Sequence, residues 1–400
     1  MLGIDSGKVT GGTWLYAAYE AANNQKDIEL HIATVADVND TKCGKEGMTS
    51  FYLLPGGGTS DYNVNSTKNT CHWQLLRNKV KPDLVIIWGT ETSFAYHAMK
   101  IMKDIPMAIY MQGVISSVYG HYFEGVSSKY RLNTARDLID RLNSKSQINK
   151  FRKQMSLEQE MFKMADGVIV ENEWCEDACL SVNPKLKIYR NMLPIRNVFY
   201  EHTWSLDKMQ RHTVFTNAGG YPIKGHHILF KALGIVKQRY PDFVCYVPGV
   251  KLDTFNSFKR KTGYMKLLTK LITENGLTNN IQFTGSITSE QMAEHISTCN
   301  VYVMPSIVEN HSSSLIEAMI VGAPVISSLT GGVASLIEHK KNGILYNSLD
   351  AESLAGNIIR VFENDDLAVS MANEAVKTRK TRRQNFGSEM TDIYRTILGK

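Results

Sequence analysis

The stretch VYVMPSIVENHSSSLIEAM, residues 301–319, decides the fold of this chain. Its first four residues are apolar, which predicts a strand buried on both faces, and Pro305 ends that strand. A loop with Glu309 follows, and we expect a helix to begin within residues 312–314, so that Glu317 lies about one turn inside it. The free N–H groups and the positive dipole end of a helix start suit a phosphate or diphosphate.

Strands and helices alternate on both sides of this stretch. The apolar runs predict strands at 28–35, 84–88, 107–111, 168–170, 187–189, 214–217, 243–247, 281–284, 301–304 and 324–327. Such alternation indicates parallel sheets covered by helices on both faces. Ten or more strands would overextend one twisted sheet, so we expect two sheets. The pattern breaks at about 193–212, which predicts an α/β protein of two Rossmann-like domains that face each other across a cleft.

Length and composition exclude several classes of protein. The 400 residues exceed one hydrophobic core and fit two or three domains. The contents of 43% hydrophobic and 21% charged residues are those of a folded globular chain. No apolar run approaches the ~20 residues of a membrane-spanning helix, and no secretory signal is visible. The 6 cysteines show no C-x-x-C spacing, so a cytoplasmic location is expected.

The net charge of +6 is unevenly distributed. Residues 129–163 hold nine Lys or Arg against four acids, and residues 377–383 hold five basic residues and no acid. Contact of the 129–163 region with an anionic membrane surface is one interpretation, since apolar side chains recur at helical spacing between 132 and 142. A solvated helix face that packs on its own domain is the other. Interleaved aromatic residues are missing, so no nucleic acid is expected.

One feature of the decisive stretch has a simpler interpretation. Ser314-x-x-Glu317 fits a capping box, in which the glutamate only satisfies backbone donors at the helix start.

His226 and His227 are adjacent rather than four residues apart, and the sequence has no Asp-x-Asp, so no metal site is expected. No G-x-G-x-x-G follows a predicted strand, which argues against a nicotinamide-dependent dehydrogenase.

The residues around 309–317 closely resemble the signature of glycosyltransferase family 4, whose members are retaining GT-B enzymes with an E-x7-E motif. The matching positions are Glu309, Glu317, Ala318, Met319, Gly322, 324–326 and Gly331-Gly332, extended by Lys224-Gly225, Gly285 and 342–346. The resemblance is dense across 214–365. Residues 82–91, 110–113 and 197–200 look like members that build bacterial capsular polysaccharide or exopolysaccharide.

The resemblance implies roles for three charged side chains. Glu309 would hydrogen-bond the donor sugar and steady positive charge at its anomeric carbon. Lys224 would neutralise the leaving diphosphate, and Glu317 would bind both ribose hydroxyls of the nucleotide. The further donor-binding residues expected on this basis are Gly219, Gly225, Asn310, Ser312, Ser313, Ser314, Gly12 and Gln112. Glu91 and His97 are the expected acceptor-binding residues.

The sequence departs from the family pattern at three places. Members commonly carry an arginine where this chain has Gly219, so one counter-charge for the diphosphate must come from elsewhere. At 112–113 many members have a histidine, whereas Gln112 cannot titrate. Gly11-Gly12 resembles the glycine-rich loop after the first strand of these enzymes, although it fits an ordinary turn as well. So few residues precede it that we expect a truncated first strand.

The implied reaction is metal-independent, retaining transfer of a sugar from a nucleotide-diphosphate sugar, with UDP as the expected nucleotide, to a glycan or lipid-linked acceptor. It would serve surface polysaccharide synthesis at the inner face of the plasma membrane, with no cofactor. We expect an acceptor-binding domain at 1–200, a nucleotide-sugar-binding domain at 201–380, and a helix at 381–400 that returns to the first domain. A GT-B nucleotide-sugar epimerase, a phosphorylase or a non-catalytic nucleotide-sugar-binding protein stays open.

Overall fold

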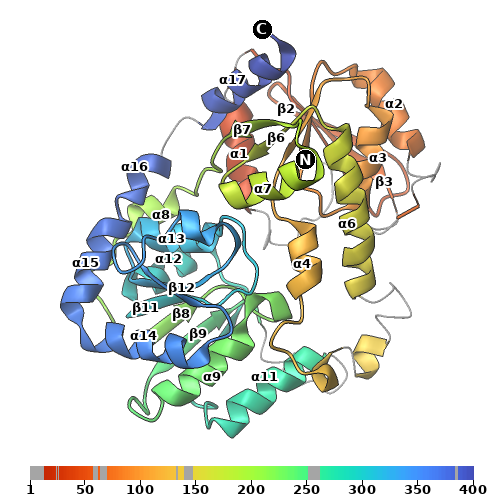
Figure 1. Ribbon diagram of the computed structural model, residues 1–400. Helices are drawn as coiled ribbons and strands as arrows, with labels where there is room; N and C mark the ends of the chain where they lie inside the picture. Colours follow the sequence, from red (N-terminus) through yellow and green to blue (C-terminus); the bar gives the residue numbers. More distant parts are fainter. Residues whose placement is uncertain are drawn as a thin grey trace. The chain divides into compact units, whose positions relative to one another are not determined.

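The structure is a computed structural model, and it describes residues 13–23, 25, 27–56, 62–63, 70–131, 134–138, 147–250, 262–382 and 386–400. The chain forms two compact units (Figure 1). The first unit spans Met1–Tyr119, Gln147–Pro194 and Gln384–Lys400, and the second spans Gly120–Ser146 and Ile195–Arg383. One segment therefore falls outside the expected division: 120–146 lies with the second unit, whereas 1–200 was expected to form the first, and the C-terminal residues lie with the first unit.

The second unit is built on a six-stranded parallel sheet of order β10-β9-β8-β11-β12-β13. Its strands are β8 (Thr213–Thr216), β9 (Val244–Pro248), β10 (Ile281–Gly285), β11 (Val301–Met304), β12 (Val325–Leu329) and β13 (Ile344–Asn347). The central strands β8 and β11 are buried along their whole length, as expected when helices cover both faces. The chain order reverses between β8 and β11. In open α/β sheets, ligands bind beyond the carboxyl ends of the strands at such a point.

Helices and short 3-10 turns connect these strands. They are α8 (Val198–Glu201), η2 (Pro222–Lys224), α9 (His226–Val236), α11 (Gly263–Glu274), α12 (Ser289–Thr298), α13 (Ser313–Val321), η3 (Gly331–Ser335), α14 (Ala351–Glu363), α15 (Asp365–Ala375) and α16 (Thr378–Arg382). Local sequence fixes several of their starts. Thr288 and Gln291 form a capping box at the start of α12, and the Asp350 side chain accepts a hydrogen bond from the backbone N–H of Ser353 at the start of α14.

The first unit holds two sheets rather than one. A parallel sheet of order β4-β5-β6-β7 is joined by a three-stranded sheet of order β1-β3-β2. The strands are β1 (His31–Ala36), β2 (Lys42–Glu46), β3 (Thr49–Pro55), β4 (Val85–Trp88), β5 (Met107–Tyr110), β6 (Gly167–Val170) and β7 (Lys187–Arg190). The expectation of one sheet per domain was therefore wrong for this unit. The antiparallel pairing of β2 with β3 supplies the extra sheet.

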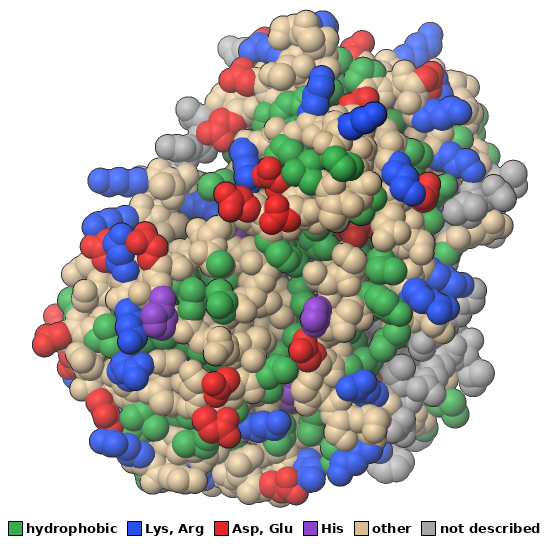
Figure 2. Space-filling model, in the orientation of Figure 1, with side chains coloured by type: hydrophobic (Ala, Val, Ile, Leu, Met, Phe, Trp, Pro, Cys, Tyr) green, Lys and Arg blue, Asp and Glu red, His purple; other side chains and the backbone are tan. Residues whose placement is uncertain are grey.

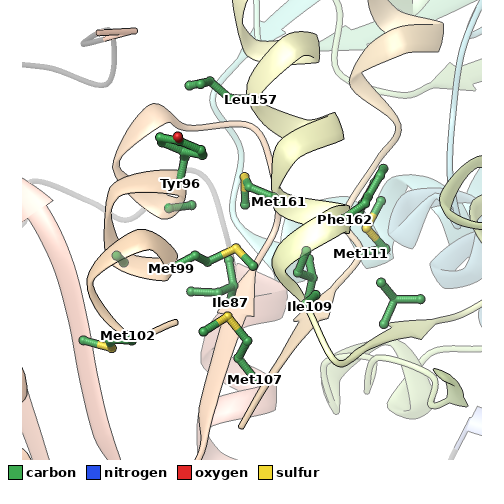
Figure 3. Close-up of a cluster of buried hydrophobic side chains, with 14 of the residues drawn as sticks. Ile87, Tyr96, Met99, Met102, Met107, Ile109, Met111, Leu157, Met161 and Phe162 are labelled. Carbon is green, nitrogen blue, oxygen red and sulfur yellow. The ribbon is translucent and has the colours of Figure 1, made fainter. Parts of the chain in front are cut away.

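The helices of the first unit are α1 (Thr13–Asn23), α2 (Thr70–Val80), α3 (Ser93–Ile101), α6 (Gln147–Met164), α7 (Glu173–Val182) and α17 (Phe386–Leu398). Alternate residues of β5 point to opposite faces of the parallel sheet. Met107 and Ile109 enter the core with α3 and α6 that Figure 3 shows. Ala108 and Tyr110 enter a second core with α1 and α17. Thus the C-terminal helix α17 completes the first unit by covering a sheet face.

The segment between α4 (Ile115–His121) and α6 packs on the second unit, and it includes η1 (Ser128–Tyr130). The Asp137 carboxylate accepts hydrogen bonds from the backbone N–H of Gly263, 2.9 Å away, and from Thr134. The backbone carbonyl of Glu124 lies 3.0 Å from Nε2 of His227. The basic region at 129–163 is thus divided, with its described residues up to 138 on the second unit and α6 on the first.

The surface shows charge of both signs. On the face in Figure 2, basic and acidic side chains are intermixed rather than separated. Among the residues that the structure describes, no helix is long and apolar enough to cross a membrane.

Candidate functional site

The loop after β11 and the start of α13 form the centre of the site. Ser312 is the N-cap of α13, and its hydroxyl accepts a hydrogen bond from the backbone N–H of Leu315. The helix ends at Gly322, whose φ of 85° is readily adopted only by glycine. Glu317 lies at the fifth residue of the helix, and its carboxylate bonds to Arg196 instead of the helix start. The capping-box interpretation of Ser314 and Glu317 was therefore wrong.

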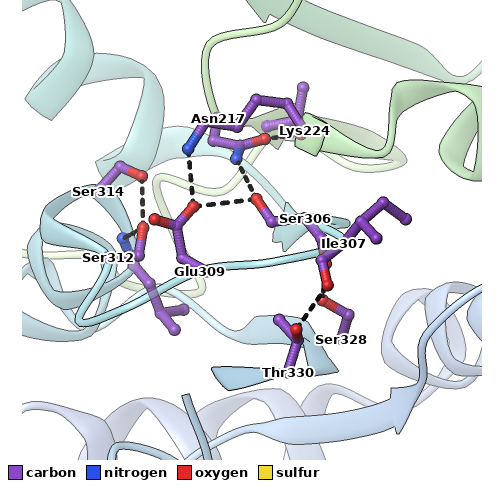
Figure 4. Close-up of polar contacts among 11 residues, drawn as sticks. Asn217, Lys224, Ser306, Ile307, Glu309, Ser312, Ser314, Ser328 and Thr330 are labelled. Atoms are coloured by element: carbon purple, nitrogen blue, oxygen red, sulfur yellow. Dashed lines mark hydrogen bonds and ion pairs between the residues drawn. The ribbon is translucent and has the colours of Figure 1, made fainter. Parts of the chain in front are cut away.

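Lys224 and Glu309 form an ion pair at the carboxyl ends of β8 and β11 (Figure 4). The lysine Nζ lies 2.7 Å from Oε2 of Glu309, which also accepts a hydrogen bond of 3.1 Å from the Ser306 hydroxyl. The Asn217 amide in turn donates to Ser306 at 3.0 Å. Although burial opposes charge on Lys224, the Glu309 carboxylate raises the pKa of the lysine. Both side chains keep some exposure, 20% for Lys224 and 16% for Glu309, so a ligand can reach the pair.

Glycines allow the two loops of this site to approach each other. Gly225 has a φ of 71°, and a Cβ there would lie 1.8 Å from the Pro305 carbonyl oxygen. Only glycine fits such a contact, which brings the loop before α9 against the loop after β11. Gly219 is restricted by a side chain, because a Cβ there would lie 2.7 Å from the His226 ring. Of the expected donor-binding residues, Gly219 and Gly225 therefore determine the shape of the β8–α9 loop.

Glu317 forms the second carboxylate of the site. Its Oε1 accepts hydrogen bonds from Nε of Arg196 at 3.2 Å and from Nη2 at 2.6 Å. The Glu317 side chain is only 4% exposed and that of Arg196 is 20% exposed. Burial raises the pKa of Glu317 to about 7, and the guanidinium opposes this shift. Arg196 precedes the family-like region, and no spacing rule connected it with Glu317, so sequence reasoning missed it.

The remaining expected donor-binding residues of this unit follow Glu309. Asn310 and Ser312 are buried, whereas Ser313 and Ser314 are half-buried. The hydroxyls of Ser312 and Ser314 lie 3.1 Å apart at the N-terminus of α13. Five of the expected residues, including Glu309, thus gather within one loop and helix start.

The site residues expected in the first unit differ in location and burial. Glu91 and Gln112 lie together beyond β4 and β5, because a Cβ on Gly89 would meet both side chains. His97, in contrast, has no exposed surface on α3, which does not fit the expected contact with an acceptor. Gly12 lies outside the described residues.

A buried carboxylate that the sequence did not single out supports this strand-end region. Glu158 of α6 is 1% exposed and accepts hydrogen bonds from the Thr90 hydroxyl and from the backbone N–H of Ile115. Burial raises the pKa of Glu158 to about 7. Nothing in the sequence distinguished it from the other charged residues of a basic helix.

The fold and this site define a class of protein before any comparison. Two Rossmann-like α/β units, with a lysine and two glutamates at the strand-order reversal of the second, have the architecture of the GT-B fold. Comparison agrees: residues 204–378 match the family model "Glycosyl transferases group 1". That part of the chain is similar to group 1 glycosyltransferases, which confirms the family resemblance drawn from the E-x7-E region.

Curated relatives resemble a little under half of the chain. The D-inositol 3-phosphate glycosyltransferase of Corynebacterium urealyticum is 24% identical over 176 residues, 44% of this chain and 41% of the relative. A GDP-mannose-dependent alpha-(1-6)-phosphatidylinositol monomannoside mannosyltransferase of Mycobacterium tuberculosis is 24% identical over 195 residues, 46% of this chain and 48% of the relative. The matched region thus spans about half the length of these relatives.

Solved structures share the fold over nearly the whole chain. Sucrose-phosphate synthase of Thermosynechococcus elongatus has a TM-score of 0.72 at 17% identity, covering 97% of this chain and 94% of the other. Anabaena HepE, in complex with UDP and glucose, has a TM-score of 0.67 at 17% identity, covering 96% of each chain. These likenesses confirm the expected GT-B fold with two Rossmann-like domains.

Within the described residues, no three His, Cys, Asp or Glu side chains come together as a metal site would require.

Proposed function

We propose that this protein is a retaining glycosyltransferase that uses a nucleotide-diphosphate sugar, with UDP as the nucleotide. The observation that carries the proposal is the Lys224–Glu309 ion pair beside the N-terminus of α13. The loop before α9 and the loop that leads into α13 together offer an ammonium, free backbone N–H groups and a carboxylate. These groups suit a ligand with both a diphosphate and a sugar. The UDP complex of the similar Anabaena structure supports the choice of nucleotide.

Each charged group has a task in the proposed reaction. The bond between the anomeric carbon and the diphosphate oxygen breaks, and negative charge develops on that oxygen. Lys224 and the N–H groups of α13 stabilise this charge, an effect worth ~3–4 kcal/mol for a well-placed group. Glu309 lies next to Lys224 and stabilises the positive charge at the anomeric carbon. The acceptor oxygen bonds to the same face of that carbon, and its proton passes to the leaving phosphate oxygen.

For the acceptor, we propose a glycan or a lipid-linked sugar of the kind used in surface polysaccharide synthesis. Two relatives carry a phosphorylated or phosphatidyl inositol in their names, which supports an anionic or lipid-linked acceptor. Glu91, beyond β4, is the side chain proposed to bind it, and Gln112, which lies beside Glu91 beyond β5, keeps its proposed role in binding the donor. The basic α6 is proposed to lie against an anionic membrane surface. Sedimentation with vesicles of neutral or anionic lipid at low salt tests this, and equal binding to both would exclude it.

The donor is tested by thermal unfolding with UDP-, GDP- and ADP-sugars. A ligand at a hundredfold excess over Kd stabilises the folded state by ~2.7 kcal/mol, which raises Tm measurably. Product analysis with the donor that binds then separates the alternatives. A transferase needs a second sugar or lipid as acceptor, whereas an epimerase alters the donor alone and a phosphorylase consumes phosphate. Binding without turnover in both the wild type and Glu309→Gln would identify a non-catalytic binding protein and overturn the proposal.

A further inference from the structure

Arg196 has no part in the proposed reaction, yet it forms a buried contact with one of the two site carboxylates. It lies directly before α8, far in sequence from α13. Two of its guanidinium nitrogens donate to Glu317, and both of these bonds go to the same oxygen, Oε1. The Oε2 atom of Glu317 accepts no hydrogen bond from the described part of the chain. It is not fully enclosed either, so it keeps some contact with solvent. One oxygen is therefore held while the other stays open.

Arg196 is itself fixed on its other sides. Its third guanidinium nitrogen donates to the Ser289 hydroxyl at the start of α12. Its guanidinium carbon lies 4.8 Å from the centre of the Phe199 ring, a cation–π distance. A planar guanidinium held by a hydroxyl, a ring and a carboxylate has little freedom to rotate. The rotamer of Glu317 is consequently fixed as well.

The electrostatic consequence is specific to Glu317. A carboxyl that is 4% exposed tends to keep its proton, and a protonated carboxyl offers a donor where a ligand hydroxyl needs an acceptor. The guanidinium counteracts this tendency, since it lowers the pKa of Glu317 that burial raises. The titratable groups on elements packed against α13 are Glu201 of α8, Glu290, Glu294 and His295 of α12, and the charged ends of α15 and α16. None of these groups shifts the pKa of Glu317, which burial raises and Arg196 lowers.

We infer that Arg196 is a positioning residue that favours the ionised form of Glu317 and turns its Oε2 towards the vicinal hydroxyls of the nucleotide ribose. The inference rests on the proposed function, because it assigns Glu317 to a nucleotide. The two lone pairs of Oε2 accept hydrogen bonds from the 2′- and 3′-hydroxyls, while Oε1 remains with the arginine. A single oxygen then recognises the diol, instead of one oxygen for each hydroxyl.

The binding experiment compares UDP with 2′-deoxy-UDP by titration calorimetry between pH 6 and 9. Arg196→Gln removes the charge and keeps polarity, and Arg196→Lys keeps the charge. Arg211→Gln is the matched control, because Arg211 forms an exposed pair with Asp365 in the same unit. At pH 7 we expect Arg196→Gln to bind UDP roughly tenfold more weakly, as for one lost charge-assisted interaction, and to stop discriminating against the 2′-deoxy ligand. Arg196→Lys should restore part of both, and Arg211→Gln should match the wild type.

The pH dependence separates positioning from simple loss of a contact. Without the guanidinium, Glu317 ionises only at higher pH, so the UDP affinity of Arg196→Gln should recover as the pH rises to 9. Glu317→Gln should abolish this recovery in the Arg196→Gln background. Equal UDP affinity and equal 2′-hydroxyl discrimination in Arg196→Gln and wild type at pH 7 would overturn the inference. Tighter binding in the variant would also overturn it, because Arg196 would then block the ribose position.

A measurement without ligand keeps the inference distinct from the proposed function. The folded-state pKa of Glu317, raised to about 7, lies above that of the unfolded chain. Its contribution to stability is therefore complete at low pH and is lost as the pH rises through the folded pKa. Arg196→Gln should move this loss to higher pH, and the Arg196→Gln/Glu317→Gln double variant should not show it. If the wild type binds no nucleotide, the proposed function fails whatever this measurement gives; if the loss does not move, positioning by Arg196 fails alone.

Discussion

The imidazole ring of His226 occupies the space that any side chain on Gly219 would need. A Cβ on Gly219 would lie 2.7 Å from both Cε1 and Nε2 of that ring. His226 is 1% exposed at the start of α9, so it cannot turn out into solvent without repacking. The arginine common in the family at position 219 is thus incompatible with the ring in its present place. At this position the glycine leaves room for the His226 ring.

This packing predicts that Gly219→Ala destabilises the second unit by about 1–3 kcal/mol, the usual cost of overpacking. His226→Ala opens the space, so Gly219→Ala should cost less in that background. Urea unfolding of the four proteins of this double-mutant cycle measures the coupling. Gly356→Ala is the control, because a Cβ at Gly356 in α14 meets nothing within 4 Å. It should be neutral or stabilising, and an equal cost for Gly219→Ala with and without the ring would contradict the prediction.

The Lys224–Glu309 pair predicts different losses for its two members. Lys224→Met removes the charge that stabilises the leaving diphosphate, so transfer should slow roughly 10²–10³-fold and nucleotide affinity should fall. Glu309→Gln keeps the lysine, so nucleotide binding should survive while transfer is lost. Steady-state kinetics and UDP titration distinguish the two. Lys237→Met serves as the control and should change neither quantity, because Lys237 is a half-buried lysine directly after α9 that donates to the Gly276 carbonyl. Wild-type turnover in Lys224→Met would refute the assigned role.

Five of the six strands of the sheet in the second unit, all but β13, and the carboxylate spacing were predictable from the sequence. Short apolar runs each bounded by a turn gave strands within about two residues of β8, β11 and β12, because central parallel strands are buried on both faces. The prediction placed the start of α13 within residues 312–314, and the structure has it at Ser313 with Ser312 as the N-cap. These features depend on local pattern and local hydrogen bonds, which a single sequence contains.

Contacts between distant segments were not predictable. Arg196 and Glu317 are 121 residues apart, and their pairing depends on how α8 packs on α13. The three-stranded sheet was missed since the exposed strand β2 (Lys42–Glu46) has no apolar alternation to mark it. Asp137 and Gly263 are 126 residues apart, and their contact attaches a segment of the N-terminal half to the second unit. Such contacts depend on tertiary packing, on which local propensity has no bearing.

Glu158 predicts a pH dependence of the stability of the first unit. Burial raises its pKa to about 7, above that of the unfolded chain, so the folded state holds an extra proton between roughly pH 4.5 and 7. Its contribution to stability is complete below this window and is lost as the pH rises through it, on the order of 3 kcal/mol at most. Glu158→Gln should remove the share of the dependence that Glu158 contributes, and should gain stability relative to wild type at pH 8 but not at pH 5.

Urea unfolding at pH 5 and pH 8 measures this difference. Glu160→Gln is the matched control on the same helix, because Glu160 forms an exposed pair with Lys163. It should change stability by less than about 0.5 kcal/mol at either pH. If Glu158→Gln and the wild type differ in stability by the same amount at pH 5 and at pH 8, the interpretation of Glu158 as a buried, proton-holding carboxyl is wrong.

The Asp137 carboxylate caps α11 from another segment, and this predicts what holds residues 120–138 on the second unit. Its Oδ2 accepts from the N–H of Gly263, the first residue of α11, which has no acceptor within its own helix. The same oxygen accepts from the backbone N–H and the hydroxyl of Thr134, at 2.9 and 2.7 Å. Asp137→Ala leaves these buried donors unsatisfied, so it should cost about 1–3 kcal/mol and release the segment. Asp137→Asn keeps an acceptor and should cost less.

Release is measured by limited proteolysis around 128–138 and by hydrogen exchange of the Gly263 amide, both of which should accelerate in Asp137→Ala. Asp104→Ala is the control, because Asp104 pairs with Arg77 on the surface of the first unit and should leave both rates unchanged. Gly263→Ala provides a second route to the same outcome, since a Cβ there would lie 2.5 Å from the Tyr130 carbonyl oxygen. Both variants break the same contact, so the double variant should lose less stability than the sum of the two single losses. Full additivity would mean that Asp137 and Gly263 hold independent parts of the unit, contrary to the shared contact.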